Sequence, residues 1–533
     1  MADTSGSVRI ELPEHDRPPR PGETDLERTD PDLELTATLV LRRPTAEGDQ
    51  AAAAQEADLF AVLNFARLNG LRVTESEPNT RSVTLAGRAS DFERILHVEL
   101  IDVELNGKRY RRYDGAPSLP AGLGEIVTGV FGLRARPTRP RPRVHHAGST
   151  EPFWTTVDLA RAYDFPEGTD GTGQVIGLIE LGGGYDEQDL RAFFSEHGLP
   201  VPSITFKSID GATNQPASPE AIQQWLDVVE GRREESDCDA TLIEAAQMTV
   251  EVTMDIELAG ALAPGAQLVV YMAPATEEGI YKALSLAIHD EQPRVDVISM
   301  SWGEPESFVS DAHVSAITQV LEDAAQRGIT VCASSGDFGA YDDPQNKTLC
   351  VNFPASSPLV LACGGSTVVR CESKIDNEIA WNCGLHGIPA STGGGVSELF
   401  GLPPWQSAEH VPLSPKGQPG RGVPDVAASA DPHNGCAIIV GGQPCSSFGT
   451  SAVAPLWAAL IARCNQALGS RAGHLNPVLY ELARSERSPF RTIVEGDNGF
   501  YRAGAGWNAC TGLGTPKGRH LLDVLRARTS NSR

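Results

Sequence analysis

The chain has 533 residues, a formal net charge of −26, 40% hydrophobic residues and 21% charged residues. This composition is typical of a globular protein. The chain is longer than a domain with a single hydrophobic core usually is, which predicts more than one domain. The negative charge argues against nucleic acids and anionic membranes as partners, because both repel an acidic surface. No apolar run predicts a membrane-spanning helix, and the polar, Pro-rich N-terminus lacks the apolar segment of a secretory signal.

The N-terminal part of the chain divides into three predicted parts. Residues 1–30 are polar and predict a disordered leader. Residues 31–135 predict a small α+β domain with the ferredoxin-like order β-α-β-β-α-β and a hairpin turn at Asn106-Gly107. Residues 136–152 are rich in Arg and Pro and predict an exposed linker, which is either a plain tether or a processing site. The expected strands are 33–41, 72–77, 81–87 and a hairpin within 98–113, and the expected helices are 51–70 and 89–98.

Residues 153–533 alternate short apolar runs with amphipathic stretches. This alternation predicts a βαβ-wound parallel sheet with helices on both faces. The segment 220–239 predicts an added helix followed by an acidic loop. The expected strands are 174–181, 266–274, 295–303, 328–337 and 357–365, and the expected helices between them are 281–292 and 314–328.

The ten cysteines show no zinc-binding spacing along the sequence. Cys436 and Cys445 flank a predicted hairpin, and Cys371 and Cys383 flank another strand-like stretch. Either pair is compatible with a disulfide, and the spacing does not decide between a bridge and free thiols. Two further cysteines in apolar runs, predicted to be buried thiols, are Cys332 and Cys363.

Ser451 lies in the string Gly-Thr-Ser-x-x-x-Pro at the start of a predicted apolar helix. Backbone N–H groups at a helix N-terminus can stabilise an oxyanion beside a serine hydroxyl, although a serine at this place is more often an N-cap. A serine nucleophile needs a base, and none of the 12 histidines lies in a His-Gly-Thr context. A lone histidine is more often structural or solvated, so no histidine stands out as this base.

Acidic residues supply the other candidates. Glu251 and Asp255 are four residues apart and share one face of a helix predicted over 250–266. A solvated acidic face is one interpretation, but the apolar neighbours predict a buried helix, in which carboxylates are costly unless they share protons. Asp337 follows an apolar strand in Ser-Ser-Gly-Asp, where it is either a turn residue or an acid in a cleft at the carboxyl end of the sheet.

Together these motifs resemble the sedolisin family, the serine-carboxyl peptidases, and especially its kumamolisin-like members. The resemblance covers nearly the whole chain after residue 150, and the N-terminal α+β segment resembles the family's pro-domain. It implies a subtilisin-like α/β fold and an acid-active, extracellular endopeptidase made as a zymogen. It also implies protein or peptide substrates and a pro-domain that inhibits its own catalytic domain. Five further strings that occur in the family's order are 179–187, 298–303, 391–397, 420–427 and 510–516.

The resemblance implies roles for individual residues. Glu180 and Trp302 correspond to a supporting hydrogen-bond network. The implied catalytic residues are Ser451 as nucleophile, Glu251 as general base, Asp255 as the acid that orients this base and Asp337 as an acid of the oxyanion hole. The implied substrate-binding residues are Ser301, Gly303, Gly394 and Asn352.

These roles agree with elementary acid–base chemistry. Glu has a reference pKa of about 4.3 against about 6.5 for His, so a glutamate base remains usable in acid. A protonated Asp337 can donate a hydrogen bond to an oxyanion, whereas an ionised one repels it. The sequence therefore predicts activity and self-processing at low pH and loss of activity toward neutrality.

Two places depart from the family pattern. Family members bind Ca²⁺ through two Asp carboxylates near the C-terminus, and both carboxylates are missing here, although Ca²⁺ prefers charged oxygen ligands. Asn352 stands where some relatives carry an Asp that helps to select basic side chains, which predicts a less cationic preference. The residues left to hold Ca²⁺ are Thr492, Ile493, Gly504, Gly506 and Asn508, with Asp497 as a substitute carboxylate.

Three other functions are weighed against this one. Some members of the family release tripeptides as exopeptidases, which needs a closed end to the substrate cleft. A neutral subtilisin-type protease is disfavoured by the missing histidine motif. A catalytically dead binding protein on the same fold would need a broken nucleophile or base, and both residues are present.

Overall fold

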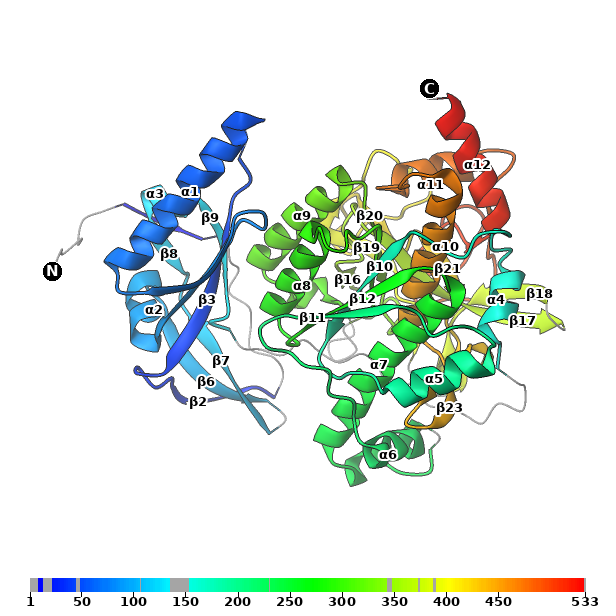
Figure 1. Cartoon of the computed structure of the whole chain (residues 1–533), viewed down its shortest axis with the longest axis horizontal. Coiled ribbons are helices and arrows are strands. Elements are labelled where there is room, and N and C mark those ends of the chain that lie inside the picture. The colour runs from blue at the N-terminus through cyan, green and yellow to red at the C-terminus, as the bar shows by residue number, and fades with distance from the viewer. Residues whose placement is uncertain are drawn as a thin grey trace. The chain divides into compact units, whose positions relative to one another are not determined.

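The structure is a computed structural model of the chain (Figure 1). It describes residues 8–12, 22–44, 48–105, 107–134, 153–229, 231–342, 348–371, 374–386 and 390–531, so the predicted linker 136–152 lies outside the described residues. The chain forms two compact units. The first comprises Met1–Thr138, Ala275–His289 and Phe308–Val320, and the second comprises Arg139–Pro274, Asp290–Ser307 and Leu321–Arg533.

The first unit contains a four-stranded antiparallel sheet in the order β4-β5-β3-β9. Helices α1 (Asp49–Leu68) and α2 (Ala89–Leu96) pack against it over an apolar core. The first and last strands of this sheet are neighbours, as the ferredoxin-like order requires. The strands are β3 (Glu34–Leu41), β4 (Arg72–Glu77), β5 (Ser82–Arg88) and β9 (Val127–Phe131).

The predicted hairpin forms, but its place in the fold differs from the prediction. β6 (Glu99–Leu105) and β7 (Lys108–Asp114) belong to a separate sheet in the order β2-β6-β7, and β9 supplies the last strand of the main sheet. The hairpin is thus an addition between the second helix and the fourth strand. The prediction took the hairpin as the last strand of the β-α-β-β-α-β order and assigned no strand to β9, although β9 lies within the predicted domain 31–135, because this short segment has no clear alternation.

The prediction of a disordered leader is wrong for two segments. β2 (Thr24–Arg28) pairs with β6, and β1 (Arg9–Glu11) pairs with β8 (Ser118–Pro120), which precedes the short helix α3 (Ala121–Gly124). Both leader strands are short and charged, so they carry no hydrophobic periodicity. Pairing with a formed strand supplies the hydrogen bonds that these segments could not supply by themselves.

Two helices from the middle of the chain also belong to the first unit, which the sequence did not predict. These are α8 (Glu277–His289) and the first part of α9 (Asp311–Gln326). The Tyr281 hydroxyl donates to Thr80 O at 2.9 Å, and Gln319 Nε2 lies 3.3 Å from Thr128 Oγ1. The N-terminal domain therefore binds these helices by direct polar contacts.

The second unit is built on a mixed sheet in the order β11-β12-β10-β13-β15-β17-β18, with β21 also paired to β17 (Figure 1). Every pair is parallel except β17 with β18. The five apolar runs predicted as strands form β10, β12, β13, β15 and β17. The strands are β10 (Val175–Leu181), β11 (Ile204–Ser208), β12 (Gln267–Ala273), β13 (Val297–Met300), β15 (Thr330–Ser334), β17 (Leu361–Cys371), β18 (Lys374–Ala380) and β21 (Val426–Ser429).

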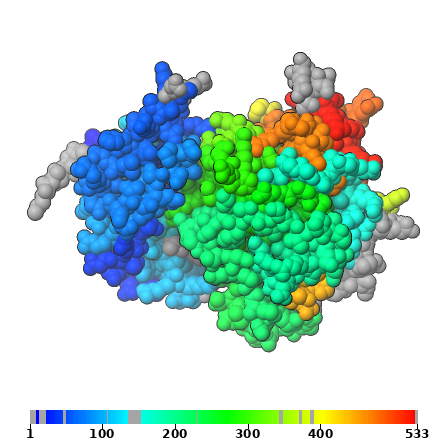
Figure 2. All heavy atoms as spheres, in the orientation of Figure 1, coloured from blue at the N-terminus to red at the C-terminus, as the bar shows by residue number. Residues whose placement is uncertain are grey.

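Helices α7 (Ala240–Leu262) and α10 (Val453–Leu468) pack against each other and against this sheet (Figure 1). Every residue of α7 from Thr249 to Leu262 is buried, which confirms the predicted buried helix. α6 (Pro219–Val229) packs on α7 and forms the green projection at the lower edge of Figure 2. Further helices of this unit are α4 (Thr156–Ala162), α5 (Glu187–Glu196), α11 (Asn476–Ala483) and α12 (Gly518–Asn531).

Short strand pairs complete the second unit around the edge where the parallel strands end. β10, β13 and β15 are parallel neighbours, so their carboxyl ends lie at one edge of the sheet and bring the residues that follow them together. The short strands are β14 (Glu304–Pro305), β16 (Asn352–Phe353), β19 (Gly395–Gly401), β20 (Gly420–Val423), β22 (Ala437–Val440), β23 (Gln443–Ser446), β24 (Phe490–Arg491) and β25 (Thr515–Pro516).

Candidate active site

Ser451 lies in a tight turn that precedes α10. The N-cap residue of α10 is Ala452, so Ser451 is not its N-cap. Gly449 has φ 72°, and a Cβ at this position would lie 2.6 Å from Asp337 Oδ2, so the turn needs glycine there. Ser451 is 2% exposed, and within the described part of the chain its hydroxyl has no hydrogen-bond partner. The hydroxyl is therefore buried and is not fixed by a hydrogen bond to another described group.

Asp337 contacts the residue next to Ser451. Thr450 N donates to Asp337 Oδ1 at 2.7 Å, and Thr450 Oγ1 lies at the same distance from this oxygen. Because a backbone N–H can only donate, Oδ1 is fixed as an acceptor, and Oδ2 is the oxygen able to carry a proton. Asp337 therefore presents a donor beside the Ser451 turn whenever its carboxyl is protonated.

Glu251 and Asp255 lie on the buried part of α7 and are 8% and 0% exposed. The solvated acidic face is therefore wrong. Ser301, which follows β13, connects this helix with the serine turn: its Oγ lies 2.7 Å from Asp255 Oδ2 and 3.2 Å from Ser451 O. Glu251 is one turn earlier on the same face of the helix. These contacts bring Asp255 close to the turn of Ser451.

Glu180 and Trp302 form the expected supporting contact. Trp302 Nε1 donates to Glu180 Oε2 at 3.2 Å, and Glu180 also shares a side-chain hydrogen bond with Asp255. Burial, followed by the negative charge of Glu251, holds the pKa of Glu180 well above its ordinary value. Burial thus favours the protonated form of Glu180, whereas its hydrogen bonds with Trp302 and Asp255 act in the opposite direction.

Two of the expected substrate positions, Gly303 and Asn352, are direct neighbours. A Cβ at Gly303 would lie 2.0 Å from Asn352 Oδ1. Asn352 Nδ2 donates to Asp342 Oδ2 at 2.6 Å, and a Cβ at Gly336 would lie 2.6 Å from Asp342 Oδ1. The sequence analysis missed Asp342, because its segment has no motif. The buried carboxyl of Asp342 thus lies beside the Asn352 amide. The prediction of a less cationic substrate preference, which considered Asn352 alone, did not include this carboxyl.

Gly394 belongs to a segment that lies against the loop of Asp337. Ser391 N donates to Asp337 O, and Gly393 N donates to Gly336 O, each at 2.8 Å. A Cβ at Gly394 would lie 2.0 Å from Ala509 O, so this backbone approaches its neighbour as closely as only glycine allows. The glycine run is therefore required by packing around the oxyanion side of the site.

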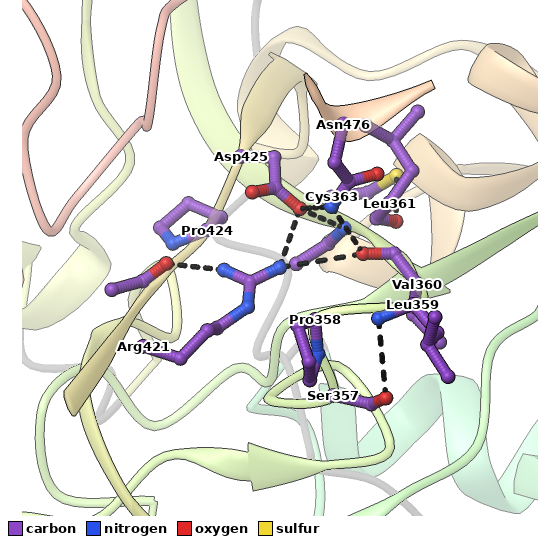
Figure 3. Close-up of polar contacts among 12 residues, drawn as sticks. Ser357, Pro358, Leu359, Val360, Leu361, Cys363, Arg421, Pro424, Asp425 and Asn476 are labelled. Atoms are coloured by element: carbon purple, nitrogen blue, oxygen red, sulfur yellow. Dashed lines mark hydrogen bonds and ion pairs between the residues drawn. The ribbon is translucent and has the colours of Figure 1, made fainter. Parts of the chain in front are cut away.

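The string 420–427 holds a buried ion pair rather than a group that could contact substrate (Figure 3). Arg421 Nη2 donates to Asp425 Oδ2 at 2.6 Å, and both side chains are 0% exposed. Ala362 N and the Tyr480 hydroxyl donate to the same carboxylate at 2.8 and 2.9 Å. Burial, followed by the charge of Asp425, keeps the pKa of Tyr480 well above its usual value, so Tyr480 remains a donor. The pair fixes β20 and β21 beside β17.

The residues expected to hold Ca²⁺ do not form a cation site. Asn508 Nδ2 donates to Ile493 O at 3.3 Å and to Gly504 O at 3.2 Å, which are two of the expected ligand carbonyls. Its Oδ1 accepts from Cys510 N and Thr511 N, and these donors fix the orientation of the amide. An N–H donor thus occupies the position that the ion would need. Thr492 and Gly506 bring no carboxylate, and Asp497 Oδ1 instead accepts from Asn382 Nδ2 and Gly499 N.

The described cysteines are free thiols, including three of the four for which a disulfide was left open: Cys383, Cys436 and Cys445. The side chain of Cys371 lies outside the described residues. Cys445 faces Ile438 across the hairpin β22–β23, so Cys436 lies diagonally from it. Cys332 and Cys363 are buried thiols, as predicted.

Comparisons with known proteins decide the family. The model of the subtilase family matches residues 171–478, and that of the pro-kumamolisin activation domain matches residues 45–136. Kumamolisin from Bacillus sp. (strain MN-32) is 40% identical over 88% of this chain and 83% of its own length. The chain belongs to the sedolisin family. It is a serine-carboxyl peptidase with an N-terminal activation domain.

A solved structure and a second relative extend the comparison. The structure of Pseudomonas sedolisin, a serine-carboxyl proteinase complexed with two molecules of pseudo-iodotyrostatin, is 28% identical. It covers 71% of this chain and 99% of its own chain with a TM-score of 0.58, which confirms the predicted subtilisin-like fold. Tripeptidyl-peptidase sed5 from Aspergillus fumigatus is 25% identical over 96% of both chains. Among the described residues, no helix combines the length and apolar character needed to cross a membrane.

Proposed function

We propose that this sedolisin-family peptidase is an acid-active endopeptidase, made as a zymogen, in which carboxyl groups carry out every proton transfer. The observation that supports this most strongly is the double anchoring of the serine turn. Thr450 binds Asp337, and Ser301 links the backbone of Ser451 to Asp255. Two buried acids from different elements therefore flank one serine, which is an arrangement for nucleophilic catalysis without histidine.

In the proposed mechanism, Ser451 Oγ attacks the carbonyl carbon of the scissile peptide bond while Glu251 accepts its proton. The oxyanion that develops accepts a hydrogen bond from the protonated Oδ2 of Asp337. Glu251 then returns the proton to the leaving amine. Water hydrolyses the acyl-enzyme by the same route in reverse, with Glu251 again acting first as base.

Glu180 and Asp255 act as positioning residues in this proposal. Glu180 shares a side-chain hydrogen bond with Asp255, and Ser301 Oγ lies 2.7 Å from Asp255 Oδ2. These contacts orient Asp255, which in this proposal orients Glu251 one turn away on the same helix face. Coupled acids of this kind allow one member to stay ionised as a base while its neighbour stays protonated.

The N-terminal domain is proposed to be the intramolecular inhibitor. Its contacts with α8 include an ion pair in which Lys282 Nζ lies 3.9 Å from Glu75 Oε2, and Lys282 also pairs with Glu278 Oε1 of its own helix at 3.1 Å. Loss of the attraction between Glu75 and Lys282 would weaken the contact. Cleavage in the linker between about residues 140 and 152 would then complete activation, because its Arg- and Pro-rich sequence predicts a segment that a protease reaches easily.

Endopeptidase activity is preferred to release of tripeptides. Kumamolisin is more similar to this chain than tripeptidyl-peptidase sed5, with 40% against 25% identity. Cleavage inside a peptide whose N-terminus is acetylated would support the endopeptidase, because an exopeptidase of the tripeptidyl type requires a free amino terminus.

We also propose that the protein acts outside the cell, since an acid range suits an extracellular medium. The Asn508 loop is proposed to hold its shape without Ca²⁺, because the amide already binds the carbonyls that the ion would bind.

The experiment that tests the proposal incubates the purified full-length chain from about pH 3 to about pH 7 with a denatured protein substrate. Ser451→Ala is the matched control, since it removes only the hydroxyl. Cleavage and self-trimming in acid by the wild type, both absent from the variant, are the expected results. Cleavage that survives in Ser451→Ala, or that is greatest at neutral pH, would contradict the proposal.

A further inference from the structure

The second unit gathers three metal-ligating side chains outside the active site. Cys383 begins the short helix η3 (Cys383–His386), Asp431 follows β21, and His433 lies in η4 (Pro432–Asn434). One ligand atom of each lies within 4.8 Å of the other two. We propose that these three residues bind Zn²⁺ or a similar thiophilic divalent cation.

The distances suit a tetrahedral ion. Cys383 Sγ lies 3.8 Å and His433 Nδ1 lies 2.9 Å from Asp431 Oδ1. With Zn–S of about 2.3 Å and Zn–N or Zn–O of about 2.0 Å, tetrahedral ligands lie about 3.5 Å apart for S and O and about 3.3 Å apart for N and O. The S–O distance is thus about 0.3 Å longer and the N–O distance about 0.4 Å shorter than such an ion needs, and Sγ and Nδ1, which lie within 4.8 Å of each other, would need to lie about 3.5 Å apart.

Neighbouring side chains hold the ligands in this orientation. Trp381 Nε1 donates to Cys383 Sγ at 3.0 Å, and Thr367 Oγ1 donates to Asp431 Oδ2 at 2.7 Å. The Thr367 bond occupies Oδ2. Oδ1 faces the sulfur and the imidazole, and it also accepts from His433 N at 2.9 Å as the N-cap of η4. Outer partners that orient each ligand are a regular feature of protein metal sites.

The burial of the group fits a site that an ion can enter from one side. Cys383 is 0% and Asp431 is 6% exposed, whereas the His433 side chain is 24% exposed. A water molecule on the imidazole side would complete four-fold coordination. A separate role for Cys383 as a nucleophile is disfavoured, because burial and then the charge of Asp431 raise the pKa of its thiol to about 12.

The site also lies next to the backbone of the active site. Ala430 O accepts from Gly449 N at 2.8 Å, so the residue before Asp431 contacts the turn of Ser451. Thr392 N donates to Trp381 O at 3.0 Å, next to the Ser391 bond to Asp337 O. A bound ion would tie these two segments together. The metal-binding proposal itself is independent of the proposed catalytic function.

The test uses purified full-length protein near neutral pH, where cobalt(II) serves as the probe because thiolate ligation gives it a charge-transfer absorption band. The expected result is one Co²⁺ per chain with this band, and its displacement by an equivalent of Zn²⁺. Cys383→Ser should abolish the band. His433→Gln, at a partly exposed position that tolerates a polar amide, should weaken binding by about a hundredfold, since metal sites lose at least tens-fold even when only an outer partner is removed.

Cys350→Ser is the control, because Cys350 is another free cysteine of the same unit and lies outside this group. It should leave the band and the stoichiometry unchanged. Absence of the band in the wild type would overturn the proposal, and so would a band that persists in Cys383→Ser. Binding that His433→Gln does not weaken would also overturn it. Circular dichroism on each variant distinguishes loss of binding from loss of folding.

Discussion

Replacement of Asp337 tests the proposed oxyanion chemistry, because the structure separates the roles of its two oxygens. Oδ1 accepts from Thr450 N at 2.7 Å, so an asparagine at this position must turn its carbonyl oxygen toward that N–H. Its NH₂ group then occupies the place of Oδ2. Asp337→Asn therefore keeps a donor toward the oxyanion at every pH, whereas Asp337→Ala has no donor at any pH.

The two variants should differ in magnitude and in pH dependence. Loss of one oxyanion donor lowers kcat by about 10²–10³-fold, which is about 2.7–4 kcal/mol, and this is the loss expected for Asp337→Ala. Asp337→Asn should stay within about tenfold of the wild type in acid, because its donor remains. It should also keep this donor toward neutral pH, because an amide does not ionise, so its activity should fall less steeply with pH than that of the wild type.

The assay is a pH profile of kcat/KM on an internally quenched peptide. Each variant is processed by immobilised wild-type enzyme, which is then removed, so that a failure to self-activate does not hide catalysis. Equal losses in Asp337→Asn and Asp337→Ala, with the fall toward neutral pH unchanged in the asparagine variant, would refute the assignment of Oδ2 as the donor.

Three further predictions concern stability, each measured by urea or thermal unfolding in a Ser451→Ala background. Asp425→Ala should cost about 3–5 kcal/mol by leaving the buried charge of Arg421 unpaired, whereas loss of the exposed Arg191 pair should cost about 0–1 kcal/mol; equal costs would contradict this. Burial raises the pKa of Glu257 well above its ordinary value. The stabilisation of the folded protein that the protonated Glu257 contributes is therefore complete below the pKa of about 4.3 that Glu has in the unfolded chain. Above that pH, the free energy of unfolding falls by about 1.4 kcal/mol per pH unit. Glu257→Gln should flatten this fall, and parallel slopes would argue against it. Chelation by EGTA should leave the melting temperature unchanged, because the Asn508 amide already binds two of the expected ligand carbonyls. Asn508→Asp should lower the melting temperature, and added Ca²⁺ should restore it. A lower melting temperature of the Ser451→Ala protein in EGTA would contradict this prediction.

The sequence was sufficient for those parts of the fold where one physical signal dominates. Buried parallel strands such as β10 and β15 are continuous apolar runs, and the Asn-Gly turn specifies the β6–β7 hairpin. It was insufficient where pairing is non-local. The charged strands β1 and β2 form only because β8 and β6 offer them an edge, and no local pattern records that edge.

The site shows the same division between local and non-local information. Motif order located Ser451, Glu251 and Asp337, because each lies in a string of unusual composition. The link through Ser301 and the acid beside Asn352 depend on loops that meet only after folding. The group of Cys383, Asp431 and His433 depends on non-local folding even more, since Cys383 and Asp431 are 48 positions apart and no spacing rule connects them.

The central claim is that carboxyl groups replace histidine as the base and acid of this serine peptidase. The most direct measurement is the pH profile of kcat/KM for the processed wild type beside processed Glu251→Gln. The account predicts a maximum in acid, a fall toward neutral pH and a loss of at least about a hundredfold in Glu251→Gln, as expected for removal of a general base. Activity that rises toward neutral pH, or that Glu251→Gln retains, would contradict it.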